Sequence, residues 1–275
     1  MSSPTRWEIF WRTVMGRAYP RVIGMQREKS WLFFDTLLPL LQVSAFVFIY
    51  RAIHAPPEFT GFVVLGGAMT AYWLNVLWSM AAQFYWEKET GNLELYIIAP
   101  TSLMAILLGM AIGGIVGTTV RALAVITVGL LIFHVQASIV SVPQFMGVFL
   151  LTLVALYGLG MLFSSLFLLY GRQAWHLSNL LQEPVFLVSG FYFPVRALGF
   201  IAALGASVIP ITLGLDAMRQ LLFPTMMVQF RFLDVRIELV VIAALSIVFL
   251  WLAKRALNYM EDLSRREGRL TIRGQ

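Results

Sequence analysis

The sequence FTGFVVLGGAMTAYWLNVLWSMAAQFYW, residues 59–86, contains no charged side chain over its whole length. A helix needs about 20 consecutive apolar residues to cross the hydrocarbon core of a bilayer. This stretch is long enough to cross, and it has no charged face for contact with water. It therefore predicts a membrane-spanning helix, and it decides the class of fold.

The composition of the whole chain agrees with this prediction. Of 275 residues, 59% are hydrophobic and 12% are charged, and the mean hydropathy is +0.80. A typical soluble domain carries about 25% charged residues. These values exclude a soluble globular enzyme, a disordered chain and a coiled coil. Cysteine is absent, which excludes disulfides, cysteine-bound zinc and a thiol nucleophile.

Further apolar runs surround the first one. Each has no charge or a single ionisable residue, and they cover residues 32–50, 95–133, 143–171, 177–194, 197–215 and 237–253. With residues 59–86 they make seven candidate spans.

The basic residues set the expected orientation. Six lie within residues 1–30 and six within residues 254–273. The positive-inside rule therefore predicts that both ends are cytoplasmic, which requires an even number of crossings. We interpret the net charge of +6 as an orientation signal and not as a surface that binds nucleic acid.

Seven candidate spans are inconsistent with an even number of crossings, so one candidate cannot be a full span. The runs in question are residues 177–194 and 197–215. Only Val195 and Arg196 separate the two runs, and Pro210 breaks the second. We expect the first to span and the second to be re-entrant or to lie in the outer leaflet. The fold expected is an all-α integral membrane protein with six spans. The alternative is a plain seventh span with one tail outside.

The chain is expected to divide into an N-terminal cytoplasmic helix at 1–30, a transmembrane domain at 31–256 and a cytoplasmic tail at 257–275. Within residues 5–18, Trp7, Phe10 and Trp11 recur at helical spacing, whereas Arg12 falls elsewhere. This pattern predicts an amphipathic helix at the membrane surface. Such a helix suits anchorage on anionic lipid or docking of a cytoplasmic partner, and both alternatives stay open.

Catalytic motifs are missing from the sequence. None of the three lysines follows a glycine, so no phosphate-binding P-loop is present, and any ATPase must be another chain. The three histidines are scattered, and no Gly-x-Ser-x-Gly elbow occurs. We predict no enzymatic activity, cofactor or metal on this chain. Arg121 and Glu183 lie in apolar runs, where each either faces a transport path or pairs within the bundle.

The loop at residues 87–102 carries three acids and one base. Leu93, Tyr96 and Ile97 have helical spacing within residues 92–98, and Pro100 should end this short helix. A short amphipathic helix on a cytoplasmic loop suits a groove on a soluble partner. An ordinary interfacial loop is the alternative.

The run Glu-Lys-Glu-Thr-Gly-Asn-Leu-Glu at 87–94, followed by Ala99-Pro100, resembles the coupling segment of type-2 ATP-binding-cassette (ABC) exporter permeases. A second match, Ser-Gly-Phe-Tyr-Phe-Pro at 189–194 with residues 210–219, resembles the re-entrant region of that family. The first segment looks most like the drug- and natural-product-resistance branch, the daunorubicin type.

This resemblance implies six spans, an interface helix, a re-entrant region at 194–219 between spans five and six, and a coupling helix in an ATPase groove. The coupling residues implied are Glu87, Glu89, Gly91, Leu93, Glu94 and Pro100. The possible path residues are Asn75, Trp78, Arg121, Phe186 and Phe191.

The partners implied are two copies of a cytoplasmic ABC ATPase, which bind ATP and Mg²⁺, a second copy of this chain or a paralogue, and membrane lipid. The location implied is the inner membrane of a prokaryote, and the cargo is amphipathic, as a drug, natural product, lipid or lipid-linked glycan is. A channel or ion-coupled transporter that works without an ATPase is the alternative function.

Overall fold

The structure, a computed structural model, describes residues 5–27, 29–135, 139–170 and 174–267. Within these ranges every regular element is helical. The chain begins with α1 (Arg6–Arg27) and α2 (Lys29–Ala52). The remaining elements are α3 (Glu58–Leu74), η1 (Asn75–Ala81), α4 (Gln83–Glu89), α5 (Asn92–Ile98), α6 (Leu103–Phe133), α7 (Val142–Tyr170), α8 (Ala174–Val188), η3 (Val195–Leu198), α9 (Phe200–Ala206), α10 (Pro210–Leu222), α11 (Pro224–Phe230) and α12 (Val235–Glu267).

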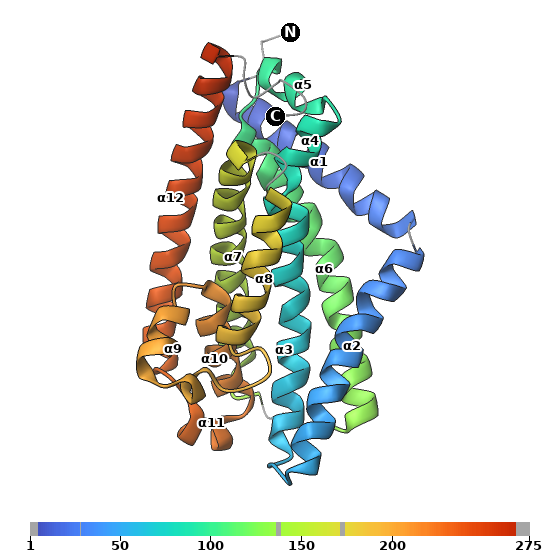
Figure 1. Cartoon of the computed structure of the whole chain (residues 1–275), viewed down its shortest axis with the longest axis vertical. Helices are drawn as coiled ribbons and strands as arrows, with labels where there is room; N and C mark the ends of the chain where they lie inside the picture. The colour runs from blue at the N-terminus through green and yellow to red at the C-terminus, as the bar shows by residue number, and fades with distance from the viewer. Residues whose placement is uncertain (1–4, 28, 136–138, 171–173, 268–275) are drawn as a thin grey trace.

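The helices form a bundle with two different ends (Figure 1). Helices α2, α3, α6, α7, α8 and α12 run along its long axis. Helices α1, α4 and α5 lie at one end, together with the C-terminal end of α12, whereas α9, α10 and α11 lie toward the other. Helix α1, the described C-terminal part of α12 and the acidic loop therefore share one end of the bundle.

Four helical stretches are long and apolar enough to cross a bilayer: 58–89, 103–133, 142–166 and 235–263. The first includes the uncharged stretch 59–86, and 94% of its most apolar window is buried. The corresponding fraction is 22% for 103–133 and for 235–263. The uncharged stretch is thus the central helix, and the other two leave much of their apolar surface for lipid.

Other apolar segments are shorter or bent. The described apolar part of α2 covers 36–52, and α8 has 15 residues. Helices α9 and α10 are bent by 111° relative to each other at the break before Pro210. The predicted interruption of the run 197–215 is therefore present. The structure supports a multi-pass helical membrane protein with four spans, or five if the bent pair counts as one.

The central helix contains a π-helical segment, η1, between α3 and α4. Asn75 begins this segment, and Trp78 lies inside it. In a π-helix one extra residue per turn widens the backbone, and such segments occur often at functional sites. Two of the predicted path residues thus lie in the irregular part of the most buried span.

Helix α1 begins with a capping box, in which Thr5 and Glu8 each accept a hydrogen bond from the backbone nitrogen of the other, at 3.3 and 2.9 Å. It then lies against α6, where two glycines spaced by four residues allow close approach. A Cβ atom on Gly109 would lie 2.5 Å from the Val14 carbonyl oxygen, and one on Gly113 would lie 2.9 Å from that of Ala18. The two glycines of this GxxxG motif on α6 therefore allow α1 to pack closely against α6.

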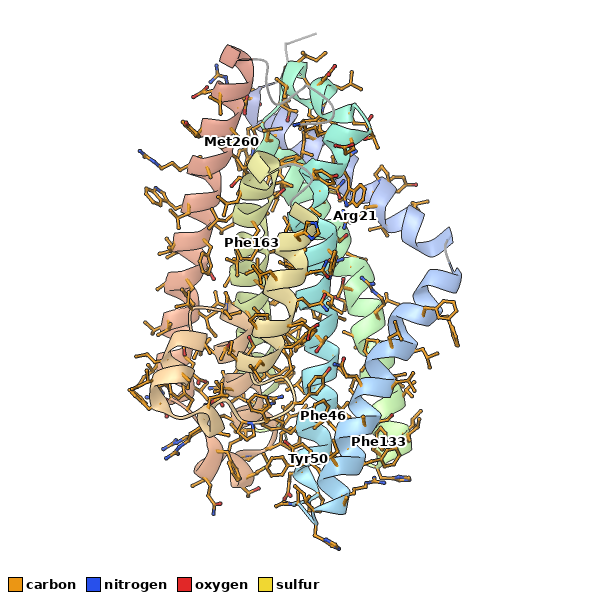
Figure 2. All side chains as sticks on the ribbon, viewed as in Figure 1. Arg21, Phe46, Tyr50, Phe133, Phe163 and Met260 are labelled. Carbon is orange, nitrogen blue, oxygen red and sulfur yellow. The ribbon has the colours of Figure 1, made fainter. Side chains whose placement is uncertain are left out.

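In the other half of the bundle, aromatic side chains connect α2 to the segment that follows α8. Phe46 and Tyr50 of α2 are labelled in Figure 2. The rings of Phe46 on α2 and Tyr192 stack with centroids 4.3 Å apart. The Tyr50 hydroxyl donates a hydrogen bond to the Tyr192 carbonyl oxygen at 2.8 Å. Helix α2 is thereby fixed to the segment that follows α8.

Candidate functional site

The segment from α4 to α6 has a conformation that its sequence explains. Gly91 has φ of +79° between α4 and α5, a conformation that favours glycine. Helix α5 covers residues 92–98, as the spacing predicted, and Ala99 is extended because it precedes Pro100. The Ser102 hydroxyl then caps α6 by accepting a hydrogen bond from the Ala105 nitrogen at 3.2 Å.

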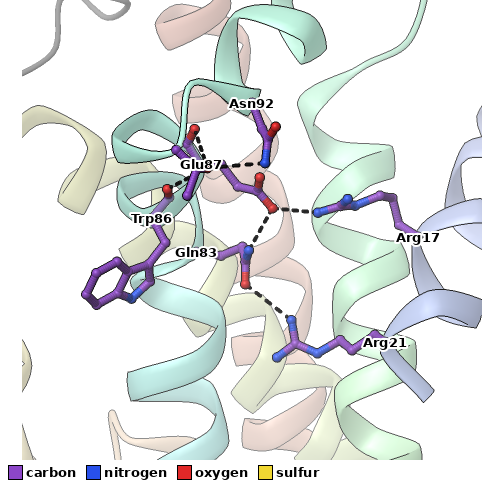
Figure 3. Close-up of polar contacts among 7 residues, drawn as sticks. Arg17, Arg21, Gln83, Trp86, Glu87 and Asn92 are labelled. Atoms are coloured by element: carbon purple, nitrogen blue, oxygen red, sulfur yellow. Dashed lines mark hydrogen bonds and ion pairs between the residues drawn. The ribbon is translucent and has the colours of Figure 1, made fainter. Parts of the chain in front are cut away.

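Side chains from α1 and α4 form a polar cluster beside this segment (Figure 3). An Arg17 guanidinium nitrogen lies 2.6 Å from a Glu87 carboxylate oxygen. The Gln83 amide donates to the same oxygen at 2.9 Å and accepts from Arg21 at 3.3 Å. Arg21 also donates to the Ser79 hydroxyl in η1. We call Arg17, Arg21, Ser79, Gln83 and Glu87 the α1–α4 polar cluster.

Tyr96 on α5 extends this cluster. The Arg17 guanidinium lies 5.0 Å from the centroid of the Tyr96 ring. Burial raises the pKa of Tyr96 to about 12, with Arg17 acting to lower it and Glu87 to raise it by smaller amounts. The phenol is therefore protonated at neutral pH and hydrogen-bonds Glu87. Burial is also the largest cause that lowers the pKa of Arg21. A second contact joins Thr101 to Thr13 of α1 at 2.9 Å between hydroxyl oxygens.

The predicted coupling residues divide into an inner and an outer set. Glu87 is 7% exposed and Leu93 is 1% exposed, so both lie inside. Glu89 and Glu94 are exposed, and so are Pro100 and the apolar side chains Leu95 and Ile98. The surface available to a partner thus consists of the outer set, whereas Glu87 connects the segment to α1.

The predicted interface residues lie on the N-terminal part of α1. The Trp7, Phe10 and Trp11 rings form a cluster with centroids 5.6–6.0 Å apart. Trp7 is 67% exposed and Trp11 is 41% exposed, and Arg12 is exposed as well. An exposed aromatic cluster next to arginine fits a helix at a membrane surface or in a protein contact.

Asn75 and Trp78 face different neighbours. The Asn75 amide oxygen accepts a hydrogen bond from the Tyr157 hydroxyl on α7 at 2.9 Å. The Trp78 indole donates to the Gln182 amide oxygen on α8 at 2.6 Å. The π-helical segment therefore connects α7 and α8 through two predicted path residues.

The other predicted path residues are spread over α6 and α8. Phe186 on α8 is half-buried, and its ring centroid lies 5.3 Å from that of Phe191, which is fully buried. Arg121 on α6 donates to the Thr118 hydroxyl at 3.0 Å. Glu183 is exposed and accepts from the Gln182 amide at 3.2 Å. The structure brings Trp78, Phe186 and Phe191 to the α8 side, and it places Arg121 on a different helix.

Arg219 on α10 is a buried charge whose role the sequence did not predict. Its guanidinium donates to the carbonyl oxygens of Gly190, Phe191 and Phe62, at 2.6, 2.6 and 3.0 Å. It also lies over the Phe62 ring, 3.3 Å from the centroid. Arg219 thus ties the bent segment to α3 and to the residues after α8. The sequence signal that could have indicated a buried role for Arg219 was its position among apolar residues in the second motif.

Two buried carboxyl groups meet beside Arg219. Asp216 on α10 accepts hydrogen bonds from the Phe232 backbone nitrogen at 3.0 Å and from the Gln220 amide at 2.9 Å. The same amide nitrogen lies 3.0 Å from a Glu238 carboxylate oxygen. This contact connects α10 to the first turn of α12. No group of three potential metal ligands occurs among the residues that the structure describes.

The comparisons with known proteins agree with this arrangement. A family model described as ABC-2 type transporter matches residues 20–223. No curated protein matched the chain. ABC-2 membrane domains are transport subunits, generally without catalytic activity, and the family implies partnership with an ABC ATPase. The resemblance drawn from the two sequence motifs is confirmed at this level. The chain therefore belongs to the ABC-2 type transporter family.

Proposed function

We propose that the chain is the permease subunit of an ATP-driven exporter. Two permeases, this chain with a second copy or a paralogue, would form the path, and two cytoplasmic ABC ATPases would bind ATP and Mg²⁺. The observation that carries the proposal is the α1–α4 polar cluster, which joins the loop at Glu87, the proposed ATPase contact, to the central span at Ser79. Such a link is what a transmission element needs.

We further propose six crossings by α2, α3–η1–α4, α6, α7, α8 and α12, in a prokaryotic inner membrane with both termini cytoplasmic. The bent pair α9–α10 would be re-entrant. Support comes from the shared end of α1, α5 and the end of α12 (Figure 1). The 111° bend also supports it, because it turns the chain back toward the end at which it entered.

In this account the ATPase contacts α5 and its flanks. Glu89 and Glu94 are exposed and acidic, and Leu95 and Ile98 are 58% and 79% exposed and apolar. A short helix with exposed apolar side chains and acidic neighbours suits a partly basic groove. The N-terminal part of α1, with Trp7 and Trp11, would flank the same contact at the membrane surface.

Movement of α5 would pass into the bundle through Glu87. Because Arg17 on α1 pairs with Glu87 near the end of α4, where the loop begins, α1 would move together with α4 and the loop. Arg21 continues the link to Ser79 in η1, next to Trp78. π-Helical segments occur often at functional sites, so η1 is the proposed site of the conformational change.

The proposed path runs along η1 and α8 and includes Asn75, Trp78, Phe186 and Phe191. Arg121, on α6, is proposed as a further path residue from a third helix. Aromatic and amide side chains suit an amphipathic cargo, such as a drug, natural product, lipid or lipid-linked glycan. We infer export rather than import from the resemblance of the coupling segment to the daunorubicin-type branch.

Charge reversal at the outer set tests this function. Glu89→Lys with Glu94→Lys should lower the ATPase activity that the permease stimulates in the purified complex, because the double change reverses the charge of the contact. Asp262→Lys, which reverses an exposed acid near the C-terminal end of α12 at the same end of the bundle, is the control. Full assembly with unchanged stimulation would contradict the docking role. Transport by this polypeptide alone in proteoliposomes would instead support the channel or ion-coupled alternative.

A further inference from the structure

At the end of the bundle that carries α9, α10 and α11, the structure has a cavity of about 580 Å³. Its walls are η3, the start of α9 and the residues before α12, and the lining side chains include Arg196, Phe200, Arg231, Phe232 and Leu233. This volume lies within the range of about 300–1,000 Å³ that small-molecule sites occupy. The lining therefore combines two cations and one acid, Asp234, with an apolar surface.

We propose that this cavity binds the phosphate headgroup of an anionic membrane lipid, with the acyl chains along α9. The orientation rests on the proposed function, which places this end of the bundle at the outer leaflet. The cavity itself does not depend on an ATPase partner.

The Arg196 side chain is held in place by one nitrogen, and its other hydrogen-bond donors are available to a ligand. One of its terminal nitrogens donates to the backbone carbonyl oxygens of Gln229 and Arg231, at 3.2 and 3.4 Å. Within the residues that the structure describes, its other two nitrogens donate no hydrogen bond. A guanidinium fixed in this way can bind a phosphate oxygen without a large loss of side-chain freedom.

The acid in the cavity wall already has partners. Asp234 accepts a hydrogen bond from the Arg236 backbone nitrogen at 3.0 Å, and so caps the start of α12. Its other oxygen lies 3.8 Å from Arg231, and both side chains are about half exposed. The helix N-terminus and Arg231 offset the charge of Asp234, and Arg196 stays without an acidic partner within the described residues.

The surface beside the cavity is strongly apolar. Phe200, Ile201 and Leu204 on α9 are 67%, 85% and 55% exposed. The ring centroids of Phe200 and Phe232 lie 5.8 Å apart. Because Phe232 lines the cavity, the exposed apolar surface of α9 is continuous with the cavity wall. Gly199, with φ of +83°, makes the turn that places Phe200 there. Exposed apolar side chains directly next to two arginines match the boundary between acyl chains and phosphates.

The test uses the purified complex in phosphatidylcholine nanodiscs with three probes. Dioctanoyl-phosphatidylglycerol has tails and a phosphate, dioctanoylglycerol has only tails, and glycerol phosphate has only the anion. We expect the first to bind at least about tenfold more tightly than either of the others, as measured by native mass spectrometry, because each lacks one of the two interactions.

The variants separate the arginines from general surface charge. Arg196→Gln with Arg231→Gln should weaken phosphatidylglycerol binding about tenfold or more, because two charge-assisted hydrogen bonds are lost. Arg196→Gln alone should give part of this loss. Arg236→Gln, an exposed arginine of the same end outside the cavity lining, should change nothing. Unfolding temperatures of all variants confirm that the fold is retained.

Equal binding by the double variant and the unchanged protein would overturn the proposal. Glycerol phosphate that binds as tightly as the lipid would also overturn it, because this would show a simple anion site. Dioctanoylglycerol that binds as tightly as the lipid would overturn it as well, because this would show that the phosphate contributes nothing. ATPase stimulation is measured on the same samples. An unchanged complex that binds the lipid but does not stimulate the ATPase would contradict the proposed function alone. An unchanged complex that stimulates the ATPase but does not bind the lipid would contradict only the lipid site.

Discussion

The ion pair between Arg17 and Glu87 should contribute measurably to stability, and its size can be worked out from the structure. The two charged groups lie 2.6 Å apart, and their side chains are 32% and 9% exposed. Fully exposed pairs contribute about 0.2–1 kcal/mol, whereas hydrogen bonds to charged groups contribute about 1.5–3 kcal/mol. Because one partner is nearly buried and the other is one-third exposed, we expect a coupling free energy of about 1.5 kcal/mol.

The perturbation is a double-mutant cycle with Arg17→Met and Glu87→Gln. Arg17→Met keeps the apolar stem but leaves the Glu87 carboxylate with only Gln83 and Tyr96, so it should cost about 2 kcal/mol. The double variant no longer has an unpaired carboxylate. Its cost should therefore be smaller than the sum of the single costs, by about 1.5 kcal/mol.

The assay is the free energy of unfolding in mixed dodecyl maltoside and SDS micelles. Arg231 and Asp234 provide the matched control, because they are 3.8 Å apart and 53% and 54% exposed. Their coupling should be below about 0.5 kcal/mol. A coupling at Arg17 and Glu87 that is no larger than this control would refute the reasoning that places α1 and α4 in one unit.

Three further changes test packing and buried polar contacts. Gly109→Leu should displace α1 from α6 and destabilise the protein by about 1–3 kcal/mol in the same micelle assay, whereas Gly147→Leu, with no atom within 4 Å of the added Cβ, should not. Arg219→Met should lower the unfolding temperature strongly because it leaves three carbonyl oxygens without their donor, and Arg219→Lys should recover part of the loss; equal temperatures for all three proteins would contradict this. Tyr157→Phe should cost about 1 kcal/mol by removing the bond to Asn75, and a change below 0.3 kcal/mol would argue against it.

The sequence predicted the local features well because local rules determine them. Residues 92–98 form a helix that ends before Pro100, as the spacing and the proline indicated. The break before Pro210 is present for the same reason, since proline disfavours a helical conformation in the residue before it. The family resemblance also rested on short contiguous motifs.

The partners of individual side chains were not predictable, because they come from distant parts of the chain. Glu87 belongs to the acidic loop, and it pairs with an arginine that lies 70 residues earlier, so no short motif indicated this contact. Arg219 binds carbonyl oxygens, which have no sequence signal. The π-helical segment at 75–81 has the same uncharged composition as its neighbours, so nothing in the pattern marked it.

The most direct test of the central claim is transport in proteoliposomes that contain this chain with and without its ABC ATPase. The probe is a panel of fluorescent amphipathic drugs and lipids, and transport is measured with ATP and with a non-hydrolysable analogue. Our account predicts accumulation only when the ATPase and hydrolysable ATP are both present. Accumulation at the same rate by this chain alone would contradict it.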